Sequence, residues 1–512
     1  MKILNKLFRY LVYALPVVLF FSYYPVITFG ASDSMNFEFS LPLLWLVVFD
    51  FLAVILLVQK WREVINDLAR GWKWLLFPIL VTLSVLWSAN VVRGVLTVGI
   101  LWLIMFAVYS IIKLKKILYD ERGFYYVFLR VFFGFTLVIC AWCILQCVLD
   151  IVGVPRENTL LCRGCTLWAF GFPHPNGFAI EPQFMGNLLL APTILATWLY
   201  VDGQANKNLR FKPSRGRVFY NRSGGPAPKL QFRTRTVTIV KNTSGSGLIN
   251  LRFLLACLFI FAVTLFLTFS RGAIYAFVIA LIFMTVFLWV RRKHGQKNIL
   301  RRVGMVWGII VLAFVFTLNL QGVMAQVSPT NDTYFTGISK VLNHLSLGII
   351  DIRANGEQSV DETTEVENES AFDGYVEEST NVRMEMTKNA LKIWSRDFKT
   401  VMFGVGIGGA GQAMYDEGLT WSPKEIVQNE YASLLAEIGV VGVLIAILAV
   451  FMIVKILIKN PVNIVILTIM VAYGISLLFF SGFANALNIY LLPPVIYIVI
   501  NDKNVIKKLK RS

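Results

Sequence analysis

The feature that most constrains this chain is a series of long apolar segments that recurs from one end to the other. A helix that crosses a bilayer needs roughly 20 mostly apolar residues. Candidate spans lie at about 8–29, 41–58, 74–88, 95–113, 125–150, 184–202, 251–269, 272–290, 304–320, 433–457, 462–481 and 484–500, of which the third and ninth are short. The sequence therefore predicts an all-α, polytopic membrane protein with about 12 transmembrane helices.

Composition agrees with this fold class. Hydrophobic residues make up 57% of the 512 residues and charged residues only 15%, whereas an ordinary soluble domain is about 25% charged. A soluble globular fold could not keep so much apolar area from water, and a disordered chain would be far more polar. The net charge of +18 raises the question of a nucleic-acid partner, which depends on where the charges lie.

Basic residues concentrate on alternate connections between the candidate spans. They gather at the N-terminus, in 59–73, 114–124, 203–250 and 291–303, and in the C-terminal tail. Segment 321–432 instead holds seventeen Asp and Glu residues against eight Lys and Arg residues. Because Lys and Arg favour cytoplasmic loops, this alternation predicts a multi-pass protein of the cytoplasmic (inner) membrane with both termini in the cytoplasm. The positive charge is then an orientation signal, and we expect membrane lipids, not nucleic acid, as its partner.

The predicted organisation has three parts. Residues 1–320 hold the first nine spans and the basic cytoplasmic connection 203–250, 321–432 form one large external loop, and 433–512 hold the last three spans and a basic tail. Within the loop, the pattern becomes helical from Asn381 to Phe403. The glycines that follow, in 403–409, lack the strand-turn-helix context of a nucleotide loop, so a tight ordered loop is the better interpretation.

Polar groups in or beside apolar spans are costly and are therefore candidates for function. Arg271 lies in the predicted turn between two spans on the external side, against the positive-inside trend. A snorkelling side chain is the structural alternative, but an arginine fork at this place suits a phosphate or pyrophosphate. Arg383, in the external loop, is a candidate for a second phosphate ligand.

A third external cluster comprises Gln428, Asn429, Glu430 and Tyr431, directly before the tenth span. Glu430 is suited either to the positive end of that helix or to a general base that activates a hydroxyl. Glu437, two turns deeper, is an acid of the span itself, suited to pairing with an arginine or to lining a cavity.

A fourth segment, 172–184, is rich in proline and therefore predicted to be non-helical, so it must be buried in protein or line a wet cavity. It carries His174, Asn176 and Glu181. His174 suits a proton carrier or a hydrogen-bonded structural residue, and Arg163 is a further external cation. Cys162 and Cys165 flank Arg163 and Gly164; whether they form a disulfide stays open.

These segments resemble the O-antigen ligase and polymerase superfamily. The resemblance rests on five pieces taken in order: Leu86-Trp87-Ser88-Ala89-Asn90, Thr268 to Ala273 around Arg271, Arg383 with Trp394, Phe403 to Gly408, and Gln428 to Gly442. Each motif is weak by itself, and their order and sides of the membrane carry the specificity. The resemblance implies a metal-independent, cofactor-free glycosyltransferase with a GT-C-like membrane fold.

The resemblance also implies the substrates and roles. The donor would be an undecaprenyl-pyrophosphate-linked glycan, whose pyrophosphate Arg271 and Arg383 would bind as the leaving group. Ligases transfer this glycan to lipid A-core, and polymerases to another lipid-linked glycan. The residues themselves, apart from the resemblance, add further candidates for substrate contacts: Asn429, Tyr431, His174, Asn176, Glu181 and Arg163.

One position departs from the ligase pattern. Nine residues separate Asn429 from Gly439, as in the ligases, but Gln428 stands where they have histidine. Glutamine takes no proton at neutral pH, so Glu430 becomes the candidate base and His174 the second candidate. This departure favours a polysaccharide polymerase acting at the outer face of the membrane. An O-antigen ligase and a transporter or flippase of lipid-linked sugars are the alternatives.

Overall fold

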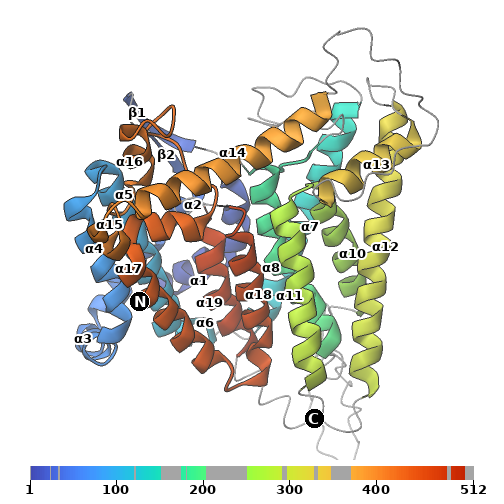
Figure 1. Cartoon of the computed structure of the whole chain (residues 1–512). Helices are drawn as coiled ribbons and strands as arrows, with labels where there is room; N and C mark the ends of the chain where they lie inside the picture. The colour runs from blue at the N-terminus through green and yellow to red at the C-terminus, as the bar shows by residue number, and fades with distance from the viewer. Residues whose placement is uncertain are drawn as a thin grey trace, which may run out of the picture.

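The computed structural model shows a bundle of long helices with a layer of further helices across one end (Figure 1). The structure describes residues 2–22, 25–32, 35–119, 123–151, 174–179, 181–202, 251–290, 297–327, 333–346, 371–480 and 486–501.

Most of the bundle consists of helices long and apolar enough to cross a membrane. In the part of the chain that is described, eight helices meet this test and a bent pair makes up to nine. The eight belong to α1 (Lys2–Val18, continued by η1, Leu19–Phe21), α2 (Leu41–Val58), α5 (Val91–Lys113), α7 (Phe124–Ile151), α8 (Pro182–Asp202), α11 (Arg271–Val290), α12 (Lys297–Val327) and α17 (Glu430–Leu457). The chain is therefore a multi-pass membrane protein.

Shorter and bent elements account for the other predicted spans. Three apolar helices are shorter, α10 (Leu251–Leu267), α18 (Ile464–Ser476) and α19 (Leu487–Ile500). The bent pair joins α3 (Trp61–Arg70) to η2 (Trp72–Leu75), α4 (Leu76–Ser84) and η3 (Val85–Trp87) at an angle of 80°. Each of the twelve predicted segments thus contains an apolar helix or a bent pair, although the count of twelve crossings stays a prediction.

Two predicted boundaries are wrong. The first helical segment ends at Phe21, and β1 (Pro25–Ser32) pairs antiparallel with β2 (Met35–Ser40) in a two-stranded hairpin where the predicted span continued to 29. The fold is thus all-α apart from this hairpin in the described ranges. The ninth span is not short, because α12 extends the predicted 304–320 segment by a turn or more at each end.

The described connections between the long helices lie in two sets, one at each end of the bundle. The hairpin lies at the same end as α13 (Tyr334–Leu345), α14 (Ala371–Trp394) and α16 (Ala410–Asp416), at the top of Figure 1. The helices α3 and α6 (Lys115–Tyr119) lie at the opposite end. Segments predicted to share a side of the membrane therefore share an end of the bundle. The assignment of these ends to cytoplasm and exterior stays a prediction.

The helix α8 forms the centre of the bundle. In its apolar window 94% of the residues are buried, against 11% in α17, which lies at the periphery. Small residues make the close packing of α8 possible: a Cβ at Gly186 would lie 2.8 Å from the Cβ of Ala273 in α11. Thr193 and Thr197 keep their hydroxyl groups satisfied by donating to α8's own carbonyls, those of Leu189 and Thr193. The first residues of α8 and α11 are therefore held side by side.

The glycine-rich segment 403–409 is a tight ordered loop, as predicted. It follows α15 (Phe398–Phe403) and packs into a break in α17 at Gly439, where φ is +62°. The break leaves the carbonyls of Ala436 and Glu437 to accept the amides of Val405 and Gly406, both at 2.9 Å. On the other side, Ser88 Oγ donates to the Ile407 carbonyl at 2.9 Å. Three of the motifs behind the family resemblance therefore meet at one place.

This loop allows a stability prediction with a matched control. Gly404 and Gly418 have nearly the same positive φ, +70° and +67°, but a Cβ at 404 would lie 2.3 Å from the Glu437 backbone, and at 418 it would meet nothing within 4 Å. We expect Gly418→Ala to cost about 1 kcal/mol of backbone strain, and Gly404→Ala about 3 kcal/mol or more because a clash adds to the strain. Thermal unfolding in detergent measures both; equal losses would contradict the packing of the loop.

Candidate functional site

The candidate site begins at the turn between α10 and α11. The chain leaves α10 after Leu267 and enters α11 at Arg271, with a tight turn between them as predicted. Phe269 has a φ of +49°, and it is the only non-glycine residue with positive φ in the described ranges. Ser270 Oγ accepts the Ala273 amide at 3.3 Å and caps α11. The turn therefore fixes where the Arg271 side chain leaves the backbone.

The C-terminal end of α18 brings further side chains to this turn. The carbonyl of Phe479 accepts Gln183 Nε2 from the start of α8 at 2.5 Å and Arg383 Nη1 from α14 at 3.4 Å. Phe479 also packs directly on α11, because a Cβ at Gly272 would lie 2.7 Å from its Cβ. Four helices, α8, α11, α14 and α18, thus meet around one carbonyl next to Arg271.

Arg271 and Arg383 lie within electrostatic range of each other. Their role as two ligands of one pyrophosphate stays a prediction. Both cations also act on His344, at the end of α13. Burial, then Arg271, then Arg383 lower the pKa of His344 to about 4, while a hydrogen bond to the Phe269 carbonyl opposes the shift. His344 is therefore neutral at pH 7 and adds no charge to the pair. An anion that reaches this place meets two arginines.

The predicted cluster at 428–431 packs on the same end of α18. The Glu430 amide donates to the Leu477 carbonyl at 3.0 Å, and Tyr431 Oη donates to the Gly474 carbonyl at 2.7 Å. Asn429 caps α17 by accepting the amides of Tyr431 and Ala432. Glu430 is 5% exposed, whereas Gln428 is exposed. The structure therefore gives Asn429 a capping contact and buries Glu430, whose amide bonds Leu477, two residues before the Phe479 carbonyl that accepts Arg383.

The segment around His174 is partly described and lies against the turn. The ring of His174 lies 5.0 Å from that of Phe269, and burial, with a smaller contribution from His344, lowers its pKa to about 3. Asn176 is buried and held by Gln146 of α7 and the Ala179 carbonyl, which is a structural set of contacts. Glu181 is exposed at the start of α8. Arg163, Cys162 and Cys165 lie outside the described residues.

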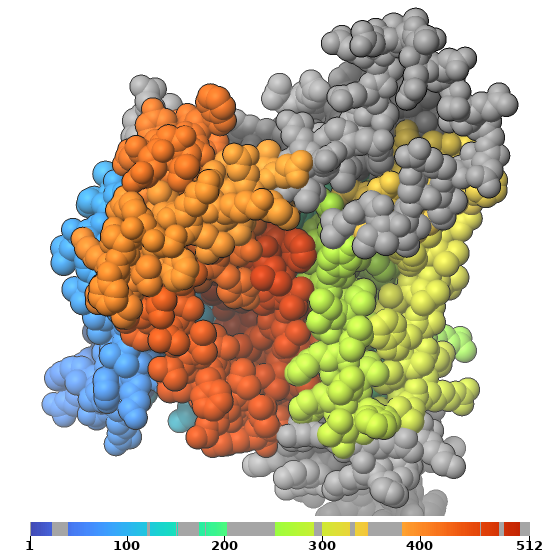
Figure 2. Space-filling view, viewed as in Figure 1, coloured from blue at the N-terminus to red at the C-terminus, as the bar shows by residue number. Residues whose placement is uncertain are grey.

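The surface is recessed beneath α14 (Figure 2). Atoms of α17 and of the α18 and α19 pair border this recess. Tyr490 of α19 lies within electrostatic range of Glu430 and Tyr431. The recess therefore adjoins the elements that carry the candidate base.

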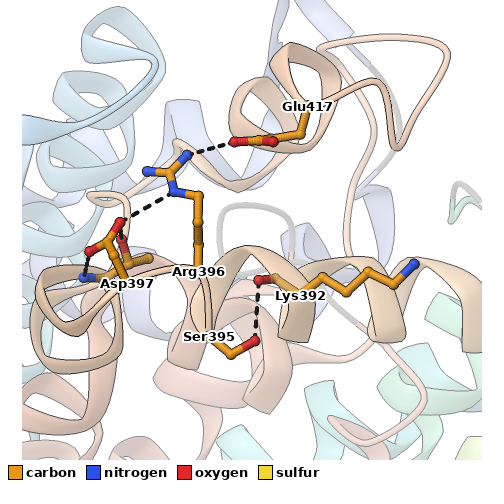
Figure 3. Close-up of polar contacts among 6 residues, drawn as sticks. Lys392, Ser395, Arg396, Asp397 and Glu417 are labelled. Carbon is orange, nitrogen blue, oxygen red and sulfur yellow. Dashed lines mark hydrogen bonds and ion pairs between the residues drawn. The ribbon is translucent and has the colours of Figure 1, made fainter.

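A polar network fixes the outer end of α14 (Figure 3). Arg396 Nη1 pairs with Glu417 at 2.9 Å and its Nε with Asp397 at 3.3 Å. Asp397 caps α15 by accepting the Thr400 amide at 2.8 Å, which lowers the pKa of Asp397. All three charged groups are close to half exposed, so each ion pair adds little stability. The network orients α14, α15 and α16 relative to one another, and we assign it no chemical role.

Sequence reasoning missed two side chains of the site, Gln183 and His344. Gln183 follows a proline at the predicted start of a span and carries no charge. His344 lies in the large loop, where a single histidine belongs to no motif. Both side chains belong to the site only because folding brings them near Arg271 and Arg383, and this proximity leaves no pattern in the sequence.

The fold and this site define a polytopic membrane protein with a cationic site at one end of its helix bundle. Residues 256–447 match a family model described as O-antigen ligase. The chain thus carries a domain of the O-antigen ligase and polymerase superfamily, which confirms the resemblance. No curated protein matches the chain. The matched residues include Arg271, Arg383 and the cluster 428–431, and the function is of the O-antigen ligase or polymerase type.

Metal ligands do not gather in the described part of the chain, where no group of three or more His, Cys, Asp or Glu side chains could hold an ion. The metal-independent reaction that the family resemblance implies stays a prediction.

Proposed function

We propose that the protein is a polysaccharide polymerase that joins lipid-linked glycans at the outer face of the cytoplasmic membrane. The observation that carries the proposal is the pair of arginines, Arg271 and Arg383, at one end of the bundle next to the α18 end that Glu430 also contacts. Two arginines and a buried carboxylate at the same end of the bundle match a reaction that expels a pyrophosphate and removes a proton. The donor is a glycan on undecaprenyl pyrophosphate.

The proposed step is a glycosyl transfer. A hydroxyl oxygen of the acceptor glycan forms a bond to the anomeric carbon of the donor, and the bond from that carbon to the pyrophosphate oxygen breaks. The electron pair leaves with the lipid pyrophosphate, whose charge Arg271 and Arg383 stabilise. The hydroxyl proton passes to the Glu430 carboxylate. Charge stabilisation of this kind is typically worth about 3–4 kcal/mol per donor group.

The other candidate residues take lesser places in this proposal. Asn429 supports the site as a helix cap, and Tyr431 donates its hydroxyl hydrogen bond to the Gly474 carbonyl of α18. Glu181 and Gln428 are exposed and suit contacts to sugar hydroxyls. His174 packs on Phe269 of the α10–α11 turn, and Asn176 holds the neighbouring residues by its bond to the Ala179 carbonyl. Arg163 remains a substrate-binding candidate from sequence.

Transfer to lipid A-core, the O-antigen ligase reaction, is the second candidate, favoured by the description of the matching family. Gln428 is the observation that favours the polymerase, because the ligase pattern has a histidine at that position. A transporter or flippase of lipid-linked sugars needs polar groups along a path through both halves of the bundle, whereas the candidate groups here gather at one end.

The product of a purified reaction distinguishes these functions. The protein in nanodiscs is incubated with lipid-linked repeat units alone, and in a second reaction with lipid A-core added. We expect a ladder of lipid-linked oligomers in the first reaction and no glycan on lipid A-core in the second. Glycan on lipid A-core without oligomers assigns the ligase, and movement of intact repeats across a liposome bilayer without any product overturns the transferase.

A further inference from the structure

A strained residue immediately precedes the cationic site. Phe269 carries a Cβ and a bulky ring, and its φ of +49° places it in the left-handed region that such residues avoid. Strain of this kind persists only where the surroundings enforce it, and it gathers at functional sites. Phe269 is two residues before Arg271, so the conformation at 269 decides the direction in which the chain enters α11.

His344 holds this strained residue by a hydrogen bond. Its Nε2 lies 3.2 Å from the Phe269 carbonyl, which can only accept, so Nε2 carries the proton and donates. The two rings also pack edge to face, with centroids 6.3 Å apart. His174 also packs on Phe269, with their ring centroids 5.0 Å apart. Two histidines from distant parts of the chain therefore contact one strained phenylalanine.

Close packing in turn fixes His344. The helix α13 lies against α12 so tightly that a Cβ at Gly337 would approach the Cβ of Ala325 to 2.6 Å. At its other end, Tyr275 of α11 donates a hydrogen bond to the carbonyl of Leu345, next to His344. Val341 joins Phe269 and Ala325 in one buried apolar cluster. His344 is 6% exposed, so its ring has little freedom to leave the Phe269 carbonyl.

We propose that His344 is a positioning residue: through the Phe269 carbonyl it holds the α10–α11 turn so that Arg271 faces the donor pyrophosphate. The inference rests on the proposed function, because it takes the donor pyrophosphate as the ligand of Arg271. Its role needs a proton on Nε2, which the Phe269 carbonyl accepts, and burial beside Arg271 and Arg383 keeps the ring neutral, so that it adds no positive charge to the pair. Misplacement of a substrate-positioning group by about 1 Å can cost 10²-fold in rate.

Variants of His344 test the proposal through the donor concentration dependence of transfer. His344→Ala removes the hydrogen bond, and we expect kcat/KM for the donor to fall about ten- to a hundredfold, mainly through a higher KM. His344→Gln places an amide N–H close to the former Nε2 and should restore most of the loss. Asn343→Ala, at the neighbouring position of α13, is the control and should keep the wild-type KM.

A double variant shows whether His344 acts through Arg271. If it does, His344→Ala should cost little more once Arg271 is already alanine, because the group it positions is gone. Additive losses would overturn the proposal. So would a His344→Gln variant as impaired as His344→Ala, since glutamine supplies the donor but cannot carry a proton at neutral pH, and that result would assign proton transfer to the imidazole.

Two further results separate this inference from the proposed function. Normal transfer by Arg271→Ala would remove Arg271 from the site and overturn both. Loss with Arg271→Ala together with a wild-type KM for His344→Ala would overturn only the positioning role. Where His344→Ala does not insert into the membrane, His344→Phe takes its place, since it keeps the ring and removes the N–H, and the same losses and the same glutamine rescue are expected.

Discussion

Replacement of Arg271 by alanine is expected to lower glycosyl transfer by about 10²–10³-fold, the usual loss when a preorganised donor to developing charge is removed. Arg271 opens α11 next to a strained turn, with Arg383 within electrostatic range. The pyrophosphate is already charged in the bound donor and gains negative charge as its bond to the sugar breaks, so the loss should appear both in the KM for the donor and in kcat. Product formation from purified donor and acceptor in nanodiscs measures it.

The matched control for this variant is Arg130→Ala. Arg130 is an exposed arginine of α7, away from the site, so its replacement removes one positive charge without touching the turn. We expect it to transfer at the wild-type rate, and both variants should insert and unfold like the parent. Arg271→Lys should recover only part of the loss, because lysine offers a point charge and lacks the planar fork of arginine. Near-normal product from Arg271→Ala would assign Arg271 to snorkelling at the membrane surface.

The outline of the bundle followed from the sequence because apolar length and charge alternation are properties of each segment by itself. The division of 251–290 into two spans needed only the length of the segment, and the structure puts the break at Thr268 to Ser270. The first span was overextended because residues 22–29 remain apolar. Val26, Ile27 and Thr28 are β-branched and follow Pro25, which favours a strand, but hydropathy alone does not distinguish the two. The predicted ninth span was too short because the residues at both ends of α12 are more polar, and a hydropathy criterion excludes them although they are helical.

The site was only partly predictable. Arg271, Arg383 and Glu430 stood out because charge near an apolar span is costly. That Arg383 and Gln183 share the Phe479 carbonyl depends on how α14 crosses the ends of α8 and α18, and these contacts join residues far apart in the chain. His344 is the clearest case: its importance lies in one hydrogen bond to a backbone carbonyl of another segment, and no side-chain pattern in the sequence records such a bond.

Glu430→Gln is expected to lower chain formation by about 10²–10⁴-fold, the range for loss of a general base, and Gln428→Ala much less. The two residues are close in the chain but differ in environment, since Glu430 is buried at the first turn of α17 and Gln428 is exposed. Glutamine at 430 keeps the size of the side chain and the backbone contact to Leu477, so the change removes the basic group and little else. The length distribution of lipid-linked oligomers measures both variants.

Which of the two variants, Glu430→Gln or Gln428→Ala, loses more chain formation decides which residue does the work of the ligase histidine. If Glu430 is the base, Gln428→His should neither rescue chain formation by the Glu430→Gln protein nor transfer glycan to lipid A-core. A larger loss from Gln428→Ala than from Glu430→Gln would instead place the acceptor at the exposed position and reduce Glu430 to a residue that stabilises the positive end of α17. Because both variants leave Arg271 and Arg383 unchanged, donor binding should be the same in each, and any difference between them belongs to the acceptor side of the reaction.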